Sequence, residues 1–110
     1  MAYQVRSEGD TIIVALSGDV DLDNSPEVRN VLLESVSGKR GVLVEMSAVS
    51  YIDSSGIASL VEAYQSARRE RTPFALVSVS DAAMRVLELA RLDQVFSIHA
   101  SLSDALADGD

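Results

Sequence analysis

The sequence lacks cysteine altogether and has a single histidine, His99, so disulfide bonds, thiolate zinc sites and histidine-rich metal sites are excluded. Basic residues are also scarce. Nine lysines and arginines stand against seventeen aspartates and glutamates, which gives a formal net charge of −8. Nucleic acids and anionic membranes attract proteins through clustered basic side chains, so neither is an expected partner. The acidity suits a basic protein partner, although it more often only keeps a protein in solution.

Long apolar stretches are missing as well. No apolar run in the sequence approaches the roughly 20 residues that a membrane-spanning helix needs. Residues 1–6 lack the apolar core of a signal peptide. We therefore expect a cytoplasmic protein.

Apolar residues make up 47% of the 110 residues, enough for a packed core in one domain that spans residues 1–110. Runs rich in β-branched residues alternate with segments whose apolar residues recur at helical spacing. The runs predict strands at residues 3–6, 11–16, 41–46, 74–79 and 95–99. Helices are predicted between them, in the order β-β-α-β-α-β-α-β-α. This order predicts an α/β fold: a small mixed sheet with an N-terminal antiparallel hairpin, largely parallel strands after it, and about four helices.

Serine begins several of the predicted helices. Ser25 precedes Pro26, which suits a first helical position, so we expect the Ser25 side chain to cap that helix. Ser80 is expected to cap a later helix, and Ser101 has capping-box spacing to Asp104 before the last helix.

Two loops that follow strands are chemically unusual. One is an acidic loop, residues 18–25, with Asp19, Asp21 and Asp23. The other is residues 50–56, which leads into a predicted helix. In α/β folds, functional residues gather in loops at the carboxyl ends of strands, so these two loops are the candidate site.

Ser54 is predicted to lie at the N-terminus of that helix, where free N–H groups and the helix dipole favour an anion. A phosphate there would add about −1.5 to −2 charges, which the fold should tolerate and a docked partner should not. Gly56 is expected to leave the backbone open to a partner. The sequence Asp-Ser-Ser-Gly is equally typical of an ordinary loop in which Ser or Asp caps the helix, and the segment alone favours that interpretation.

Catalysis and metal binding find less support. A serine nucleophile needs a base, His99 is the sole histidine, and no G-x-S-x-G elbow surrounds either serine. The acidic loop resembles half of a calcium loop but lacks the glycine and the distal glutamate at the required spacing. No phosphate-binding G-x-x-x-x-G-K-[ST] loop is present. We expect no cofactor and no metal.

Three segments together resemble the STAS domain, of the anti-sigma factor antagonist type. They are VSYIDSSGI at residues 49–57, LSGDVD at residues 16–21, and the stretch from VSD at residues 79–81 to ARLDQVF at residues 90–96. The resemblance extends over about residues 3–107 and implies a small mixed sheet with helices, as the predicted order does.

The resemblance also implies a mechanism. The unmodified protein would bind an anti-sigma factor that is a serine kinase. The kinase would use its own ATP and Mg²⁺ to phosphorylate the first serine of D-S-S-G, which is Ser54, and this would break the complex until a phosphatase reset it. Ser55 is the fallback acceptor, and Asp53 would help to orient the acceptor. The implied partner-binding residues are Gly18, Asp19, Asp21, Asp23, Asp53, Ser54, Ser55 and Gly56. At Asp23 relatives vary, so this extra acid bears on partner specificity.

Two rival functions stay open. The same fold could serve as a constitutive accessory subunit of a bacterial lipid-transport ATPase, without a phosphorylation cycle. A small hydrolase would need a catalytic base near Ser54, which the sequence does not supply.

Overall fold

The computed structural model describes residues 3–108 of the chain. Its elements are β1 Tyr3–Glu8, β2 Thr11–Val20, α1 Ser25–Ser37, β3 Val42–Ile52, α2 Ser54–Glu70, β4 Phe74–Val77, α3 Asp81–Leu89, the 3-10 helix η1 Leu92–Gln94, β5 Ile98–His99 and α4 Leu102–Asp108. The strands lie in the order β1-β2-β3-β4-β5, with β1 antiparallel to β2 and every later pair parallel. The predicted element order and mixed sheet are therefore confirmed.

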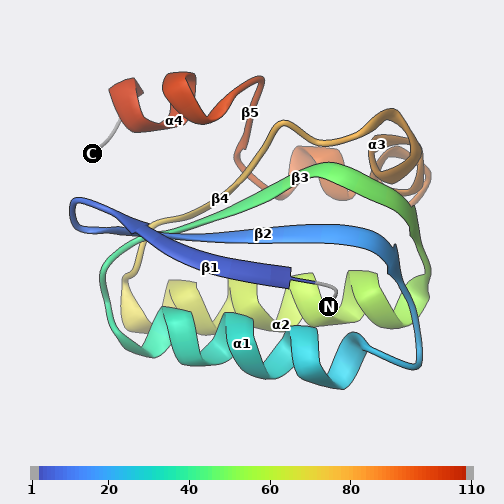
Figure 1. Ribbon diagram of the computed structural model, residues 1–110, viewed down its shortest axis with the longest axis horizontal. Coiled ribbons are helices and arrows are strands. Elements are labelled where there is room, and N and C mark those ends of the chain that lie inside the picture. The colour runs from blue at the N-terminus through green and yellow to red at the C-terminus, as the bar shows by residue number, and fades with distance from the viewer. Residues whose placement is uncertain (1–2, 109–110) are drawn as a thin grey trace.

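The helices cover the sheet from both sides. Helices α1 and α2 lie side by side under one face and α4 lies on the other, whereas α3 lies near the carboxyl end of β3 and adds Ala83 and Leu87 to the core of α1 and α2 (Figure 1). Alternate residues of the strands point toward α1 and α2, and Val14, Val44 and Leu76 are completely buried there together with Leu32 and Leu60 of the helices. Each fully buried side chain of this size contributes about 1.5–3 kcal/mol relative to an exposed one, so this layer holds the sheet and the two helices together. Among residues 3–108, no helix has both the length and the apolar character that a membrane crossing requires.

Strands β2 and β3 are longer than the sequence predicts. The predicted ends, Leu16 and Met46, are followed by polar residues that interrupt the apolar pattern. The backbone nevertheless continues to pair, as Gly18 with Val49 and Val20 with Ile52, across two irregularities in the register of β2. Ladder hydrogen bonds depend on main-chain groups, so exposed polar side chains need not end a strand. The carboxyl ends of both strands thus reach the candidate site.

The last two strands are shorter than predicted. Strand β4 ends at Val77 because Ser78 adopts a φ of +51°, which leaves the extended conformation. Val95 and Phe96 lie outside β5 because their N–H groups donate to the carbonyl of Leu92 and close a tight turn. The predicted strand 95–99 is therefore reduced to its last residues.

One predicted helix cap is wrong and two are confirmed. The N-cap of α1 is Asn24, and Ser25 is a buried first helical residue rather than the cap. At α3 the Ser80 hydroxyl oxygen accepts the N–H of Ala83 at 3.2 Å. At α4 the Ser101 hydroxyl oxygen accepts the N–H of Asp104, as the capping-box spacing predicts.

Candidate functional site

The two chemically unusual loops lie at one end of the sheet. Strands β2 and β3 run in parallel, so the loop from β2 to α1 and the start of α2 meet at their carboxyl ends (Figure 1). The N–H of Asp53 donates to the carbonyl of Val20 at 3.1 Å, which ties the start of α2 to the end of β2. The hydroxyl of Ser50 donates to the carboxylate of Asp19 at 3.2 Å. We call this end of the sheet the carboxyl edge.

Asp53 is the N-cap of α2. Its backbone is extended, with φ −104° and ψ −174°. Its Oδ1 atom accepts three hydrogen bonds: from the hydroxyl of Ser55 at 2.6 Å, from the N–H of Ser55 at 2.9 Å and from the N–H of Gly56 at 3.1 Å. The sequence left Ser and Asp open as caps, and the structure assigns the cap to Asp53.

The pKa of the Asp53 carboxyl lies below its usual value of 3.8. The largest cause is the hydrogen bond from the Ser55 hydroxyl, followed by the bond from the N–H of Gly56. Desolvation opposes these two effects, and the N–H groups of Ser55 and Leu22 lower the pKa by smaller amounts. Leu22 belongs to the loop between β2 and α1. The Asp53 carboxylate is therefore held by the first turn of α2 and lies near the loop between β2 and α1.

The two serines of this segment differ in environment. Ser54 is the exposed first residue of α2, and its hydroxyl makes no hydrogen bond within residues 3–108. Ser55 is half-buried, and its hydroxyl is engaged by Asp53. The Ser54 hydroxyl is therefore accessible from solvent without the loss of a contact within the described residues.

Asn24, which the sequence analysis did not single out, organises the acidic loop. Its side-chain oxygen accepts the N–H of Asp21 at 2.9 Å, and its side-chain N–H donates to the carbonyl of Asp19 at 2.7 Å. Oδ1 of Asp21 accepts the N–H of Asp23 at 3.0 Å. The preference of Asn for helix N-caps was the available signal, but the neighbouring Ser-Pro pair placed the predicted cap one residue later.

Gly18 and Gly56 have different roles. Gly18 lies within β2 at a φ of +71°, a left-handed conformation that glycine adopts without strain, next to the register shift. Gly56 is buried: a Cβ atom there would approach Cγ1 of Ile52 to 2.7 Å and Cγ1 of Val20 to 2.9 Å. The expectation that Gly56 leaves its backbone open to a partner is wrong, because this face of the glycine packs on the sheet.

Of the predicted site residues, the carboxyl edge brings together Gly18, Asp19, Asp21, Asp23, Asp53, Ser54, Ser55 and Gly56. Of these, Gly18, Asp19, Asp23 and Ser54 are exposed. No group of three or more His, Asp or Glu side chains that could hold a metal ion occurs among the described residues.

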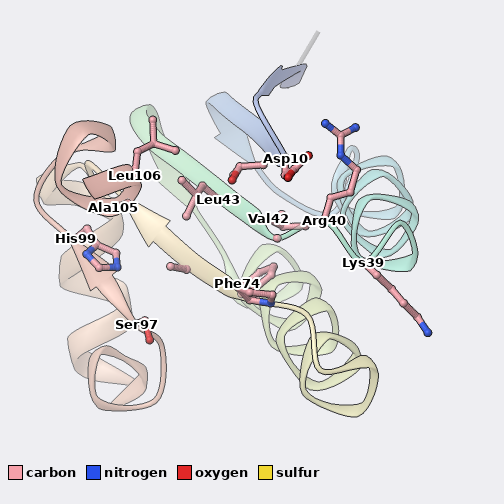
Figure 2. Close-up of a pocket in the computed structure, with 14 residues that line it drawn as sticks. Asp10, Lys39, Arg40, Val42, Leu43, Phe74, Ser97, His99, Ala105 and Leu106 are labelled. Atoms are coloured by element: carbon pink, nitrogen blue, oxygen red, sulfur yellow. The ribbon is translucent and has the colours of Figure 1, made fainter. Parts of the chain in front are cut away.

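A hollow of about 580 Å³ lies away from these residues (Figure 2). Leu43 and Phe74 line it, together with Ala105 and Leu106 of α4 and with Arg40 from the loop before β3. His99 also lines this hollow, whereas no residue of the candidate site does. The geometry therefore offers no pairing of His99 with Ser54 as base and nucleophile.

Comparison with known proteins agrees with this geometry. The family model of the STAS domain matches residues 2–105. The chain is 30% identical over 91 residues to the anti-sigma-B factor antagonist of Listeria monocytogenes, which covers 81% of this chain and 79% of the relative. The anti-sigma-B factor antagonist of Bacillus subtilis is 22% identical over 96 residues, which cover 87% of this chain and 88% of that relative.

Solved structures match the whole fold. An anti-sigma factor antagonist from Mycobacterium paratuberculosis superposes with a TM-score of 0.87 at 26% identity, covering 96% of this chain and 91% of that one. The unphosphorylated form of the Bacillus anti-sigma factor antagonist SpoIIAA superposes with a TM-score of 0.81 at 17% identity, covering 96% of this chain and 93% of that one. Its phosphorylated form superposes with a TM-score of 0.77 at 16% identity, covering 99% of this chain and 100% of that one. The sequence motifs, the mixed sheet and these matches together show that the chain belongs to the STAS domain family.

Proposed function

We propose that this chain is an anti-sigma factor antagonist that binds an anti-sigma factor kinase through its carboxyl edge and is released when Ser54 is phosphorylated. The observation that carries the proposal is the Ser54 hydroxyl, which is exposed at the first position of α2 and engaged by no other described residue. The kinase supplies ATP and Mg²⁺, a phosphatase resets the switch, and the chain itself catalyses nothing. The cycle takes place in the cytoplasm.

Ser54 is a better acceptor than Ser55. Phosphorylation of Ser55 would remove the 2.6 Å hydrogen bond from its hydroxyl to Asp53 and would place a dianion against the carboxylate that caps α2. Ser54 carries no such contact, so its phosphate can extend into water. The acceptor is therefore the first serine of the segment.

The domain is expected to keep its fold after modification. Negative charge at the first turn of a helix is favourable by about 0.3–1 kcal/mol, which offsets part of the repulsion from nearby Asp53. An exposed phosphate also stays hydrated. Phosphorylation is expected to destabilise the complex instead, because a partner that covers Ser54 must remove water from the dianion or place an apolar or acidic surface against it.

The names of two similar proteins support this proposal. The Listeria relative is named for antagonism of an anti-sigma factor, and SpoIIAA has structures named as unphosphorylated and phosphorylated forms. The motif D-S-S-G at residues 53–56 lies at the start of α2 in this chain.

The proposal is tested with the purified kinase partner and ATP. Mass spectrometry should place one phosphate on Ser54, and Ser54→Ala should accept none there. In binding measurements Ser54→Ala should hold the kinase persistently, whereas Ser54→Asp should bind poorly.

Ser7→Asp is the matched control, because Ser7 is an exposed serine on edge strand β1, outside the carboxyl edge, and the change in charge is the same. It should bind like the wild type. Equal binding by Ser54→Asp and Ser54→Ala would refute the switch and favour a constitutive adaptor.

A further inference from the structure

An exposed leucine lies in the acidic loop at the carboxyl edge. Leu22 is 74% exposed, in the loop that joins β2 to α1. A single exposed leucine is ordinary on a protein surface. This one is unusual because hydrogen bonds fix its loop and because that loop follows the end of β2, to which the start of α2 with the proposed acceptor is tied.

Hydrogen bonds fix the position of Leu22. The N–H groups of Asn24 and Ser25 donate to the carbonyl of Asp21, which closes a turn around it. On either side of it, the N–H of Asp21 donates to Asn24 and the N–H of Asp23 donates to the Asp21 carboxylate. A side chain presented by a fixed loop loses little conformational entropy when it binds, which favours affinity.

A second exposed apolar side chain lies at the same edge. Tyr51 is 52% exposed and pairs in register with Asp19 on the neighbouring strand. Its neighbour Ile52 points into the sheet–helix layer, where it meets Gly56, so alternation along β3 places Tyr51 on the opposite side. Tyrosine combines apolar area with a hydroxyl and is enriched in protein interfaces.

The charges around Leu22 indicate the chemistry of its partner. Asp21 and Asp23 flank it, and the Asp23 side chain makes no hydrogen bond within residues 3–108. An unengaged, exposed carboxylate next to an apolar side chain is complementary to a basic group at the rim of an apolar socket. The net charge of −8 adds long-range attraction toward such a surface.

We propose that Leu22 is an apolar anchor that inserts into a socket of the protein partner, with basic side chains at the rim that face Asp23. Tyr51 extends the contact on the other side of the sheet edge. The inference rests on the proposed function, since the partner is the one that covers Ser54. It adds that affinity comes from Leu22, that long-range attraction and specificity come from Asp23, and that Ser54 controls release.

The test measures the affinity of single variants for the purified kinase partner. Leu22→Ala should weaken binding about tenfold or more, because it removes most of an apolar side chain that becomes buried. Asp23→Asn should lower the association rate and reduce its dependence on salt. Val5→Ala is the matched control: Val5 is 47% exposed on β1, outside this edge, and its variant should bind within twofold of the wild type.

These outcomes separate the two proposals. If Leu22→Ala binds within twofold of the wild type while Ser54→Asp is released, the anchor is wrong and the switch stands. If Leu22→Ala binds weakly but Ser54→Asp binds normally, the anchor stands and the switch fails.

Two further measurements guard the interpretation. Thermal unfolding of Leu22→Ala should match the wild type, since the side chain is exposed. Because the chain has no cysteine, Leu22→Cys provides a unique thiol for an environment-sensitive fluorophore, whose emission should shift to the blue only when the partner is added. A shift caused by a second copy of the chain would assign the surface to self-association and overturn the proposal.

Discussion

Replacing Gly56 by alanine tests how closely α2 must approach the sheet. The added Cβ atom would lie 2.7 Å from Cγ1 of Ile52, 2.9 Å from Cγ1 of Val20 and 3.0 Å from the carbonyl oxygen of Val20. That carbonyl already accepts the N–H of Asp53, so it cannot turn aside without losing a hydrogen bond. The first turn of α2 must therefore move away from the sheet.

The expected cost follows from two opposing effects. Inserting a methyl group into a packed site costs roughly 1–3 kcal/mol, and exchanging glycine for alanine inside a helix returns up to about 1 kcal/mol. The net destabilisation of Gly56→Ala should be about 1–2 kcal/mol. For a domain of about 100 residues this lowers Tm by about 5–10 °C.

Gly38→Ala is the matched control. Gly38 lies at the C-terminus of α1 with a φ of −74°, and a Cβ atom there would meet nothing nearer than the Ser35 carbonyl oxygen at 3.5 Å. This substitution should stabilise the protein by about 0.4–1 kcal/mol, because alanine reduces the conformational entropy of the unfolded chain and fits the native backbone at this position. Thermal and urea unfolding followed by circular dichroism measure both variants. A Gly56→Ala protein as stable as Gly38→Ala would refute the close packing of α2.

Three further predictions concern the contacts around the fold. The pKa of Asp53 is lowered in the folded protein, so its carboxylate stabilises the fold at pH values above its ordinary pKa of 3.8, and this contribution is lost as pH falls through the lowered pKa. In acid titrations the difference in unfolding free energy between wild type and Asp53→Asn should shrink as pH falls below 3.8. Ser80→Ala removes the α3 cap and a 2.7 Å hydrogen bond to the carbonyl of Val49, and urea unfolding should show a loss of about 1–2 kcal/mol. The ion pair between Arg29 and Glu62 is 2.8 Å long but both side chains are nearly half exposed, so Glu62→Gln should cost less than about 1 kcal/mol, and less still in high salt.

The sequence predicts most of this fold because its elements follow strong local patterns. The apolar spacing of residues 25–37 and 54–70 and the β-branched runs at Thr11 and Val42 identify helices and strands that the structure contains. The ends of β2 and β3 were predicted too early, because they depend on pairing between segments that are distant in sequence. Strands β2 and β3 continue through Ser17 and Ser47 because each supplies main-chain partners to the other, which neither segment reveals alone.

The candidate site was only partly predictable for the same reason. The D-S-S-G segment and the acidic loop were identified from residue types and resemblance. Asp53 accepts the Ser55 hydroxyl while its own N–H donates to the carbonyl of Val20, and this arrangement depends on two strands that are distant in sequence meeting at one edge. Gly56 was misinterpreted because a glycine that gives room to a partner and one that gives room to the sheet look identical in sequence.

The continuation of β2 and β3 up to Val20 and Ile52 has a dynamic consequence. The backbone beneath the acidic loop is part of a paired ladder, so its amide protons should exchange slowly with solvent even though several of its side chains are exposed. A protein partner would then bind a surface that is already folded, so no segment of this edge has to fold during binding. Encounter should be governed by collision and charge, with a rate set by ionic strength rather than by a conformational step.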